Sequence, residues 1–260
     1  ETYTFGNKKY AYRVLMGDPL GSFYGYRYKG VYQNVEETYA VDKTGQQIMD
    51  INGAPVVVKN GDQKVYPGDA KYEDVNGDGV IDENDIVYLG NSNPTLTGGL
   101  NFTLRYKKLS LVAALHGRAG QKVINESRIN MENMYGKNNQ SVAVLRRWRS
   151  EGDNTDIPRA LYDKGYNYLG SDRFVEDASF LRLKTITLKY QFPENWMKPL
   201  GINKLEIYAT GYDLFVWTKY TGQDPEINLK NPDGSAAQVA IDSNNTPKAM
   251  RFAFGLNLRF

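Results

Sequence analysis

The chain has 260 residues, of which 41% are hydrophobic and 24% are charged, and its 32 Lys and Arg against 30 Asp and Glu give a net charge of +2. This near-neutral balance argues against a partner such as nucleic acid. Cysteine is absent and His116 is the only histidine, which excludes disulfides, thiolate zinc sites, cysteine nucleophiles and multi-histidine metal sites. No apolar run is long enough for a membrane-spanning helix. The chain starts at Glu1 without a methionine or an apolar leader, so we expect a piece of a longer protein.

The first 94 residues show little regular periodicity. Glycine and proline interrupt residues 17–31, where intervening aromatic residues indicate a short extended piece. Residues 42–70 are polar and rich in turn signals, with too little apolar periodicity for an independent core. We therefore expect a region of loops.

From about residue 95 the pattern alternates with a period of two. Two such runs, at 95–106 and 109–116, flank the tight connection Lys107-Lys108 and predict a hairpin. Further runs follow at about 178–191 and 203–217, and a phase slip near Lys184 indicates a β-bulge. The last eleven residues alternate most cleanly, with Phe252 and Phe254 on the apolar face. We therefore expect five long strands.

The connections between these strands alternate in length. The links at 107–108 and 192–202 are short, whereas 120–175 and 218–249 are long. Residues 120–150 lose the period of two, and the roughly helical spacing of Val123, Ile124, Met131 and Met134 predicts one or two short helices there. Short turns on one side and long loops on the other are typical of a barrel in an outer membrane. A soluble β-sandwich is the alternative, because its strands also alternate.

Five strands are too few to close a barrel. An open edge in hydrocarbon would leave unpaired backbone groups that cost several kcal/mol each. If the strands cross a membrane, the chain must therefore pair with a larger polypeptide.

Residues 74–85 match the template of a calcium-binding loop, in which oxygen ligands stand at fixed positions around a sharp glycine turn. Gly79 occupies the turn position, and aspartate replaces the usual glutamate at position twelve. The predicted ligands are Asp74, Asn76, Asp78, the backbone carbonyl of Val80, Asp82 and Asp85. The spacing predicts a structural Ca²⁺ that holds a loop, and the alternative is a surface loop of Asx turns without a metal.

Several short motifs, spread in order over nearly all of the chain, carry a resemblance to a known family. They are residues 17–26, 30–33, 68–72, 74–81, 90–94, Arg147-Trp148 with 155–160, 171–177, 179–184, 213–215, 218–220, 224–226 and 254–258. Together they resemble the C-terminal part of the SusC/RagA-type TonB-dependent outer-membrane transporters of the Bacteroidetes.

The resemblance implies an all-β fold, namely the C-terminal strands of a large antiparallel transmembrane β-barrel of about 22 strands with long extracellular loops. Residues 1–94 would form an extracellular loop region, and 95–260 would supply five transmembrane strands with outer loops at 120–175 and 218–249. Phe260 would belong to the signal for assembly of the barrel.

The resemblance also implies a function, the import of oligosaccharides or peptides across the outer membrane of a Gram-negative bacterium. The partners would be the remaining N-terminal barrel and plug polypeptide, a SusD-like surface lipoprotein that acts as a lid, and TonB acting through the absent N-terminal part. The alternative function is a soluble extracellular β-sandwich binding module with a structural calcium loop.

Two groups of aromatic and basic residues are candidates for contact with the substrate or the lid. They are Tyr24 and Tyr26 in a tyrosine-rich segment, and Arg147 and Trp148 in a basic stretch. The alternative is that all four pack within the chain. Asp224 and Glu226 form a carboxylate pair of the kind that glycosidases use, but two acids at this spacing are common in loops. We expect no catalytic site and no enzyme activity.

Overall fold

The computed structural model describes residues 2–5, 8–11, 16–163, 165–230 and 239–260. The chain divides into two compact units. We call Pro94–Gln121, Asp177–Glu226 and Asn245–Phe260 the sheet unit, and Glu1–Asn93, Lys122–Glu176 and Ile227–Asn244 the loop unit. Each unit is described by itself.

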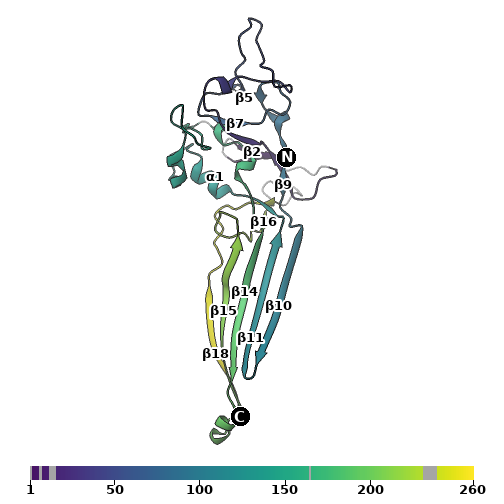
Figure 1. The fold of residues 1–260 in the computed structure, drawn as a ribbon, viewed down its shortest axis with the longest axis vertical. Coiled ribbons are helices and arrows are strands. Elements are labelled where there is room, and N and C mark those ends of the chain that lie inside the picture. Colours follow the sequence, from purple (N-terminus) through teal and green to yellow (C-terminus); the bar gives the residue numbers. More distant parts are fainter. Residues whose placement is uncertain (1, 6–7, 12–15, 164, 231–238) are drawn as a thin grey trace. The chain divides into compact units, whose positions relative to one another are not determined.

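The sheet unit is one antiparallel sheet of five long strands in the order β10-β11-β14-β15-β18 (Figure 1). The strands are β10 (Leu96–Tyr106), β11 (Leu109–Ala119), β14 (Phe180–Gln191), β15 (Lys204–Thr218) and β18 (Arg251–Arg259). They lie where the alternation predicts strands. The short link between β14 and β15 contains α2 (Glu194–Met197) and the 3₁₀ turn Lys198–Leu200.

The register of this sheet aligns apolar residues into rows on one face. One row crosses all five strands through Leu104, Leu111, Leu188, Ala209 and Phe254. Leu104 is 60% exposed and Phe254 is 80% exposed, although large apolar side chains normally avoid water. The described residues of the sheet unit contain no second sheet to cover this face, so the sandwich alternative is wrong for this unit.

The neighbouring row points to the opposite face, because successive side chains of a strand alternate. It runs through Thr103, Val112, Thr187, Thr210 and Ala253. The hydroxyl groups of Thr187 and Thr210 lie 2.9 Å apart. The sheet therefore has one apolar and one more polar face.

The predicted bulge near Lys184 is confirmed. The register shifts between Ala114 and Leu115 opposite β14, and again between Leu183 and Thr185 opposite β15. An extra residue reverses the alternation of the strand, so Leu183 before the bulge and Ile186 after it lie on the same apolar face. The bulge thus keeps that face continuous.

The loop unit is built from short strands and turns. Its strands are β1 (Thr2–Phe5), β2 (Lys8–Ala11), β3 (Ser22–Gly25), β4 (Tyr28–Val31), β5 (Lys59–Asn60), β6 (Gln63–Lys64), β7 (Ala70–Tyr72), β8 (Val80–Ile81), β9 (Val87–Asn91), β12 (Lys122–Ile124), β16 (Leu229–Lys230) and β17 (Val239–Ala240), and β13 (Val175–Asp177) pairs with β12. Its helix is α1 (Glu126–Glu132), with 3₁₀ turns at Glu36–Thr38, Glu83–Asp85, Val142–Arg146, Gly165–Tyr168 and Asp172–Phe174. Within the described ranges, no helix has the length and apolarity needed to cross a bilayer.

The loop unit buries two apolar clusters, which the sequence did not indicate. One includes Phe23, Ile129 and Phe174, and the other joins Val58 and Val65 to tyrosines from β4 and β7 and their surroundings. Residues 42–70 therefore do contribute to a core, in concert with distant segments. The expected short helices are present as α1 and the turn at Val142–Arg146, but Val123 and Ile124 lie in strand β12 and not in a helix.

Candidate functional site

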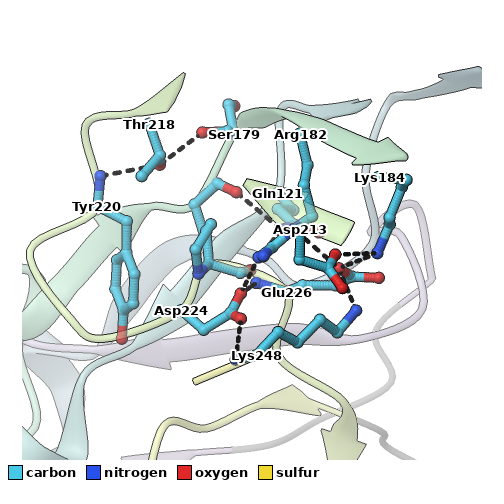
Figure 2. Close-up of polar contacts among 12 residues, drawn as sticks. Gln121, Ser179, Arg182, Lys184, Asp213, Thr218, Tyr220, Asp224, Glu226 and Lys248 are labelled. Atoms are coloured by element: carbon cyan, nitrogen blue, oxygen red, sulfur yellow. Dashed lines mark hydrogen bonds and ion pairs between the residues drawn. The ribbon is translucent and has the colours of Figure 1, made fainter. Parts of the chain in front are cut away.

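Six charged side chains from separate segments of the sheet unit meet in one network (Figure 2). The members are Arg182 and Lys184 from β14, Asp213 from β15, Asp224 and Glu226 from the segment after β15, and Lys248 from the segment before β18. Three cations thus face three carboxylates, so the network is balanced in charge.

The centre of the network is the buried pair of Arg182 and Asp224. Their side chains are only 3% and 7% exposed, and Nη2 of Arg182 donates to Oδ1 of Asp224 at 2.5 Å. Asp224 also accepts hydrogen bonds from the backbone N–H groups of Glu226 at 2.9 Å and Lys248 at 3.3 Å. Since buried charges are costly unless they are paired, this pair holds the segment after β15 against β14.

Glu226 receives three cationic groups on one oxygen. Oε2 lies 2.9 Å from Nζ of Lys184, 2.5 Å from Nζ of Lys248 and 3.4 Å from Nε of Arg182. Burial alone would raise the pKa of the Glu226 carboxyl, but the hydrogen bonds from Lys184 and Lys248 outweigh burial and lower that pKa to about 2. A general acid of a glycosidase needs a raised pKa, so this geometry favours an ion-pair role for Glu226.

Two uncharged side chains extend the network to the strand ends. Nε2 of Gln121 donates to the backbone carbonyls of Ala178 at 2.8 Å and Pro225 at 3.1 Å. The Thr218 hydroxyl donates to the carbonyl of Ser179 at 2.8 Å. The base of the 218–249 connection is therefore fixed to the ends of β11, β14 and β15.

The sequence motifs marked Asp224-Pro225-Glu226 and Arg182 separately, but nothing in their spacing joined them. The available signal was the position of Arg182 in the alternation, which places it on the polar face. An arginine there needs a carboxylate partner if loops cover it, and the acid-rich segment after β15 is the nearest source in the chain.

The predicted calcium loop is held together by hydrogen bonds from its own backbone. Asp74 accepts from the N–H groups of Gly77 at 2.6 Å and Gly79 at 2.7 Å. Asp85 is fully buried and accepts from the N–H group of Asp82 at 2.9 Å. Burial raises the pKa of Asp85 above its ordinary value, although these backbone bonds lower it.

The remaining predicted ligands are engaged in the same way. Asp78 accepts from the N–H of Val80 at 2.8 Å and from the amide of Asn76 at 2.8 Å, and Asp82 accepts from the N–H of Asn84 at 2.8 Å. Among the residues that the structure describes, no three His, Cys, Asp or Glu side chains group closely enough to hold a metal ion. The oxygen donors suit Ca²⁺ chemically, and the predicted ligands also include the Asn76 side chain and the backbone carbonyl of Val80. Calcium binding stays a prediction.

Tyr24 and Tyr26 are both buried in the loop unit. The hydroxyl of Tyr24 donates to Oδ2 of Asp18 at 2.5 Å, and its ring meets that of Tyr88 edge-on. The ring of Tyr26 lies 5.8 Å from that of Tyr72. Both rings therefore pack against other residues of the loop unit. Their contact with a substrate or a lid stays a prediction.

Arg147 and Trp148 are half-buried in the same unit. Nη1 of Arg147 donates to the carbonyl of Val144 at 3.3 Å. The indole of Trp148 lies over Gly68, where an added Cβ would come within 2.3 Å of Cε3. The contact of Arg147 and Trp148 with a substrate or a lid also stays a prediction.

Comparisons with known proteins identify relatives of the chain. No family model matches it. It is 32% identical over 253 residues to TonB-dependent receptor P26 of Formosa agariphila, and the alignment covers 95% of this chain and 23% of that protein. It is 30% identical over 249 residues to receptor P3 of the same organism, at 94% and 22% coverage. It is 29% identical over 217 residues to TonB-dependent receptor SusC of Bacteroides thetaiotaomicron, at 83% and 19% coverage.

Solved structures agree with this relationship at the level of the fold. The RagAB peptide transporter matches with a TM-score of 0.63 and 21% identity over 96% of this chain and 25% of that one. The RagAB peptide importer in its closed-closed state matches with a TM-score of 0.62 and 20% identity, at 99% and 28% coverage. The chain spans about a quarter or less of the length of the curated relatives above. The resemblance drawn from the motifs is confirmed, and so is an all-β fold that forms part of a barrel without closing one.

Proposed function

We propose that this chain, a segment of the SusC/RagA type of TonB-dependent transporter, forms part of the wall and outer loops of an outer-membrane importer. The observation that carries the proposal is the row of apolar residues across all five strands, exposed at Leu104, Leu188 and Phe254, with a more polar row on the opposite face. Outer-membrane barrels alternate in this way, with apolar side chains toward lipid and polar ones toward the lumen.

The edges of the sheet support a larger partner. Within the described strands, β10 and β18 each have only one neighbour. Unpaired backbone groups in hydrocarbon would cost several kcal/mol each. The remaining strands of the barrel would satisfy both edges by pairing with β10 and β18.

The substrate and the other partners follow from the relatives. Two solved relatives of the fold are named as parts of a peptide importer or transporter, and one sequence relative is named SusC. We propose oligosaccharides or peptides as the cargo, a SusD-like lipoprotein as the lid, and TonB as the partner that pulls on the plug, driven by the proton-motive force. The segment itself has a passive role and no enzyme activity.

Two neighbouring residues of β10 test the membrane assignment. Leu100→Arg places a charge on the apolar face near the middle of β10, which costs about 2–4 kcal/mol at the bilayer midplane, whereas Asn101→Arg places the same charge on the polar face. In the complete receptor, Leu100→Arg should reduce the heat-modifiable band on an unboiled gel of the outer-membrane fraction, and Asn101→Arg should leave it near the wild-type level.

The gel also reports on the unsubstituted protein. A compact band that shifts on boiling supports a barrel. A receptor absent from the outer-membrane fraction, or equal yields of both arginine variants, would contradict the assignment.

A further inference from the structure

The loop unit contains a polar pocket of about 510 Å³ that no motif indicated. Its walls come from segments far apart in the sequence, namely β4, the turn at Glu36–Thr38, β7, the turn at Val142–Arg146 and residues 154–156. The charged side chains that line it are Lys29, Glu37, Lys71, Arg146 and Asp156, and the amides are Gln33 and Asn154. A concave site with few, convergent polar groups is the usual form of a ligand site.

Hydrogen bonds between the distant segments fix the walls. Nε2 of Gln33 donates to the carbonyl of Thr155 at 3.3 Å, and the hydroxyl of Tyr28 donates to the carbonyl of Asp156 at 2.6 Å. The ammonium group of Lys71 lies 5.4 Å from the centre of the Tyr32 ring. The pocket is therefore held open by the fold and does not depend on one mobile side chain.

Two of the three cations in the pocket already have carboxylate partners. Nζ of Lys29 lies 3.0 Å from Oε1 of Glu73, and Nζ of Lys71 lies 3.3 Å from Oε2 of Glu37. Glu73 is also shared with Arg27 at 3.1 Å, which leaves this wall with an excess of positive charge.

Arg146 is the cation without a partner. Its side chain is exposed, and no hydrogen bond or ion pair joins it to another residue of the described part of the chain. The lining holds three cations and two carboxylates, Glu37 and Asp156. One excess positive charge suits a monoanion, and the two carboxylates disfavour a dianion such as a phosphate monoester.

We propose that this pocket binds a carboxylate group of the transported substrate through the guanidinium fork of Arg146, with Lys71 and Lys29 beside it. Guanidinium and carboxylate match in a planar, two-bonded geometry. The amide of Gln33 and the backbone of 154–156 supply hydrogen-bonding groups for the adjoining part of the ligand. The inference rests on the proposed import function and adds the substrate class, a molecule that carries a carboxylate.

The test is isothermal titration of the complete, detergent-purified receptor with matched probes. Trigalacturonate is compared with neutral maltotriose, and a terminally blocked Ala-Glu-Ala peptide is compared with Ala-Gln-Ala. We expect one acidic probe to bind about tenfold or more tighter than its neutral match. The pair that shows the difference identifies the source as an oligosaccharide or a peptide.

Arg149 offers a matched control in the same basic stretch. It is exposed, its Nη2 donates to the carbonyl of Leu145 at 2.9 Å, and it does not line the pocket. Arg146→Gln should abolish the preference for the acidic probe, and Arg149→Gln should retain it. Equal binding of acidic and neutral probes in both pairs, or equal losses in the two variants, would overturn the inference.

The membrane fraction separates this outcome from a failure of the import function. A receptor that enters the outer membrane but shows no acidic preference refutes only the pocket. A receptor that does not enter the outer membrane refutes the import function, while the titration still decides the pocket.

Discussion

Removal of the Asp224 carboxylate should release the base of the 218–249 connection. Asp224→Ala leaves the guanidinium of Arg182 buried, with only the 3.4 Å approach to Glu226 in place of its 2.5 Å bond. The substitution also removes the acceptor for two backbone N–H groups. Removing one partner of a buried ion pair typically costs about 3–5 kcal/mol.

A cost of this size raises the open population of the connection by about a hundredfold or more. Removing the other partner should cost less, because Arg182→Met leaves the Asp224 carboxylate, which still accepts both backbone hydrogen bonds. Lys248→Ala removes a partner that is 40% exposed, and partly exposed pairs contribute about 1 kcal/mol or less. The expected order of effect is Asp224→Ala, then Arg182→Met, then Lys248→Ala.

Limited proteolysis of intact cells that carry the complete receptor measures this order. Cleavage in 218–249 should be fastest for Asp224→Ala and near the wild-type rate for Lys248→Ala, with the heat-modifiable band unchanged in both. The double variant Arg182→Met with Asp224→Leu should recover much of the resistance, because it leaves no unpaired buried charge. Cleavage of Asp224→Ala at the rate of Lys248→Ala would refute the role assigned to the buried pair.

Three further predictions use other features of the chain. The pKa of Glu226 is lowered to about 2. The ion pairs of Glu226 therefore contribute fully to the stability of the connection above the unfolded-state pKa of about 4.3, and this contribution is lost as the pH falls toward 2. Pepsin should cut 218–249 readily near pH 2 but little near pH 4. If the 74–85 loop binds calcium, Asp78→Ala should lower the calcium content of the purified receptor, measured by mass spectrometry, and Asp50→Ala, in a similar turn, should not. Equal calcium contents in the wild type and both variants would eliminate the site. Gly68→Ala should destabilise the loop unit by about 1–3 kcal/mol, because the new methyl group clashes with the indole of Trp148. Gly152→Ala, at a similar positive φ but in open space, should cause only backbone strain. Equal proteolytic sensitivity of the two variants would contradict the clash.

The sheet unit could be predicted from the sequence because its signal is local. A period of two needs only neighbouring residues, so the five strands and even the bulge at Lys184 follow from the alternation. The loop unit gave no such signal, because strands of two or three residues such as β5 and β8 carry no measurable period. Val58 and Ile81 become core residues only when distant segments pack together.

The sites divide in the same way. The acidic spacing of 74–85 is a local pattern and was recognised, but a pattern of residue types does not say whether the carboxylates accept from the backbone or from an ion. In the structure Asp74 and Asp85 accept from the backbone. The pocket around Arg146 combines segments separated by more than a hundred residues, so no spacing in the sequence could have shown it.

The ion-pair network explains why charged residues stand at both ends of the 218–249 connection. Lys248 stands at the end of this connection and Glu226 near its beginning, 22 residues apart, and the two side chains meet at 2.5 Å. Closing a connection of this length costs conformational entropy that grows only slowly with the length of the loop. The ion pair at the base offsets part of this cost. The burial of Val239 and Ile241 in the apolar cluster of the loop unit offsets another part. The two ends and the middle of the connection are therefore held by different forces, charge pairing at the base and apolar packing at Val239 and Ile241.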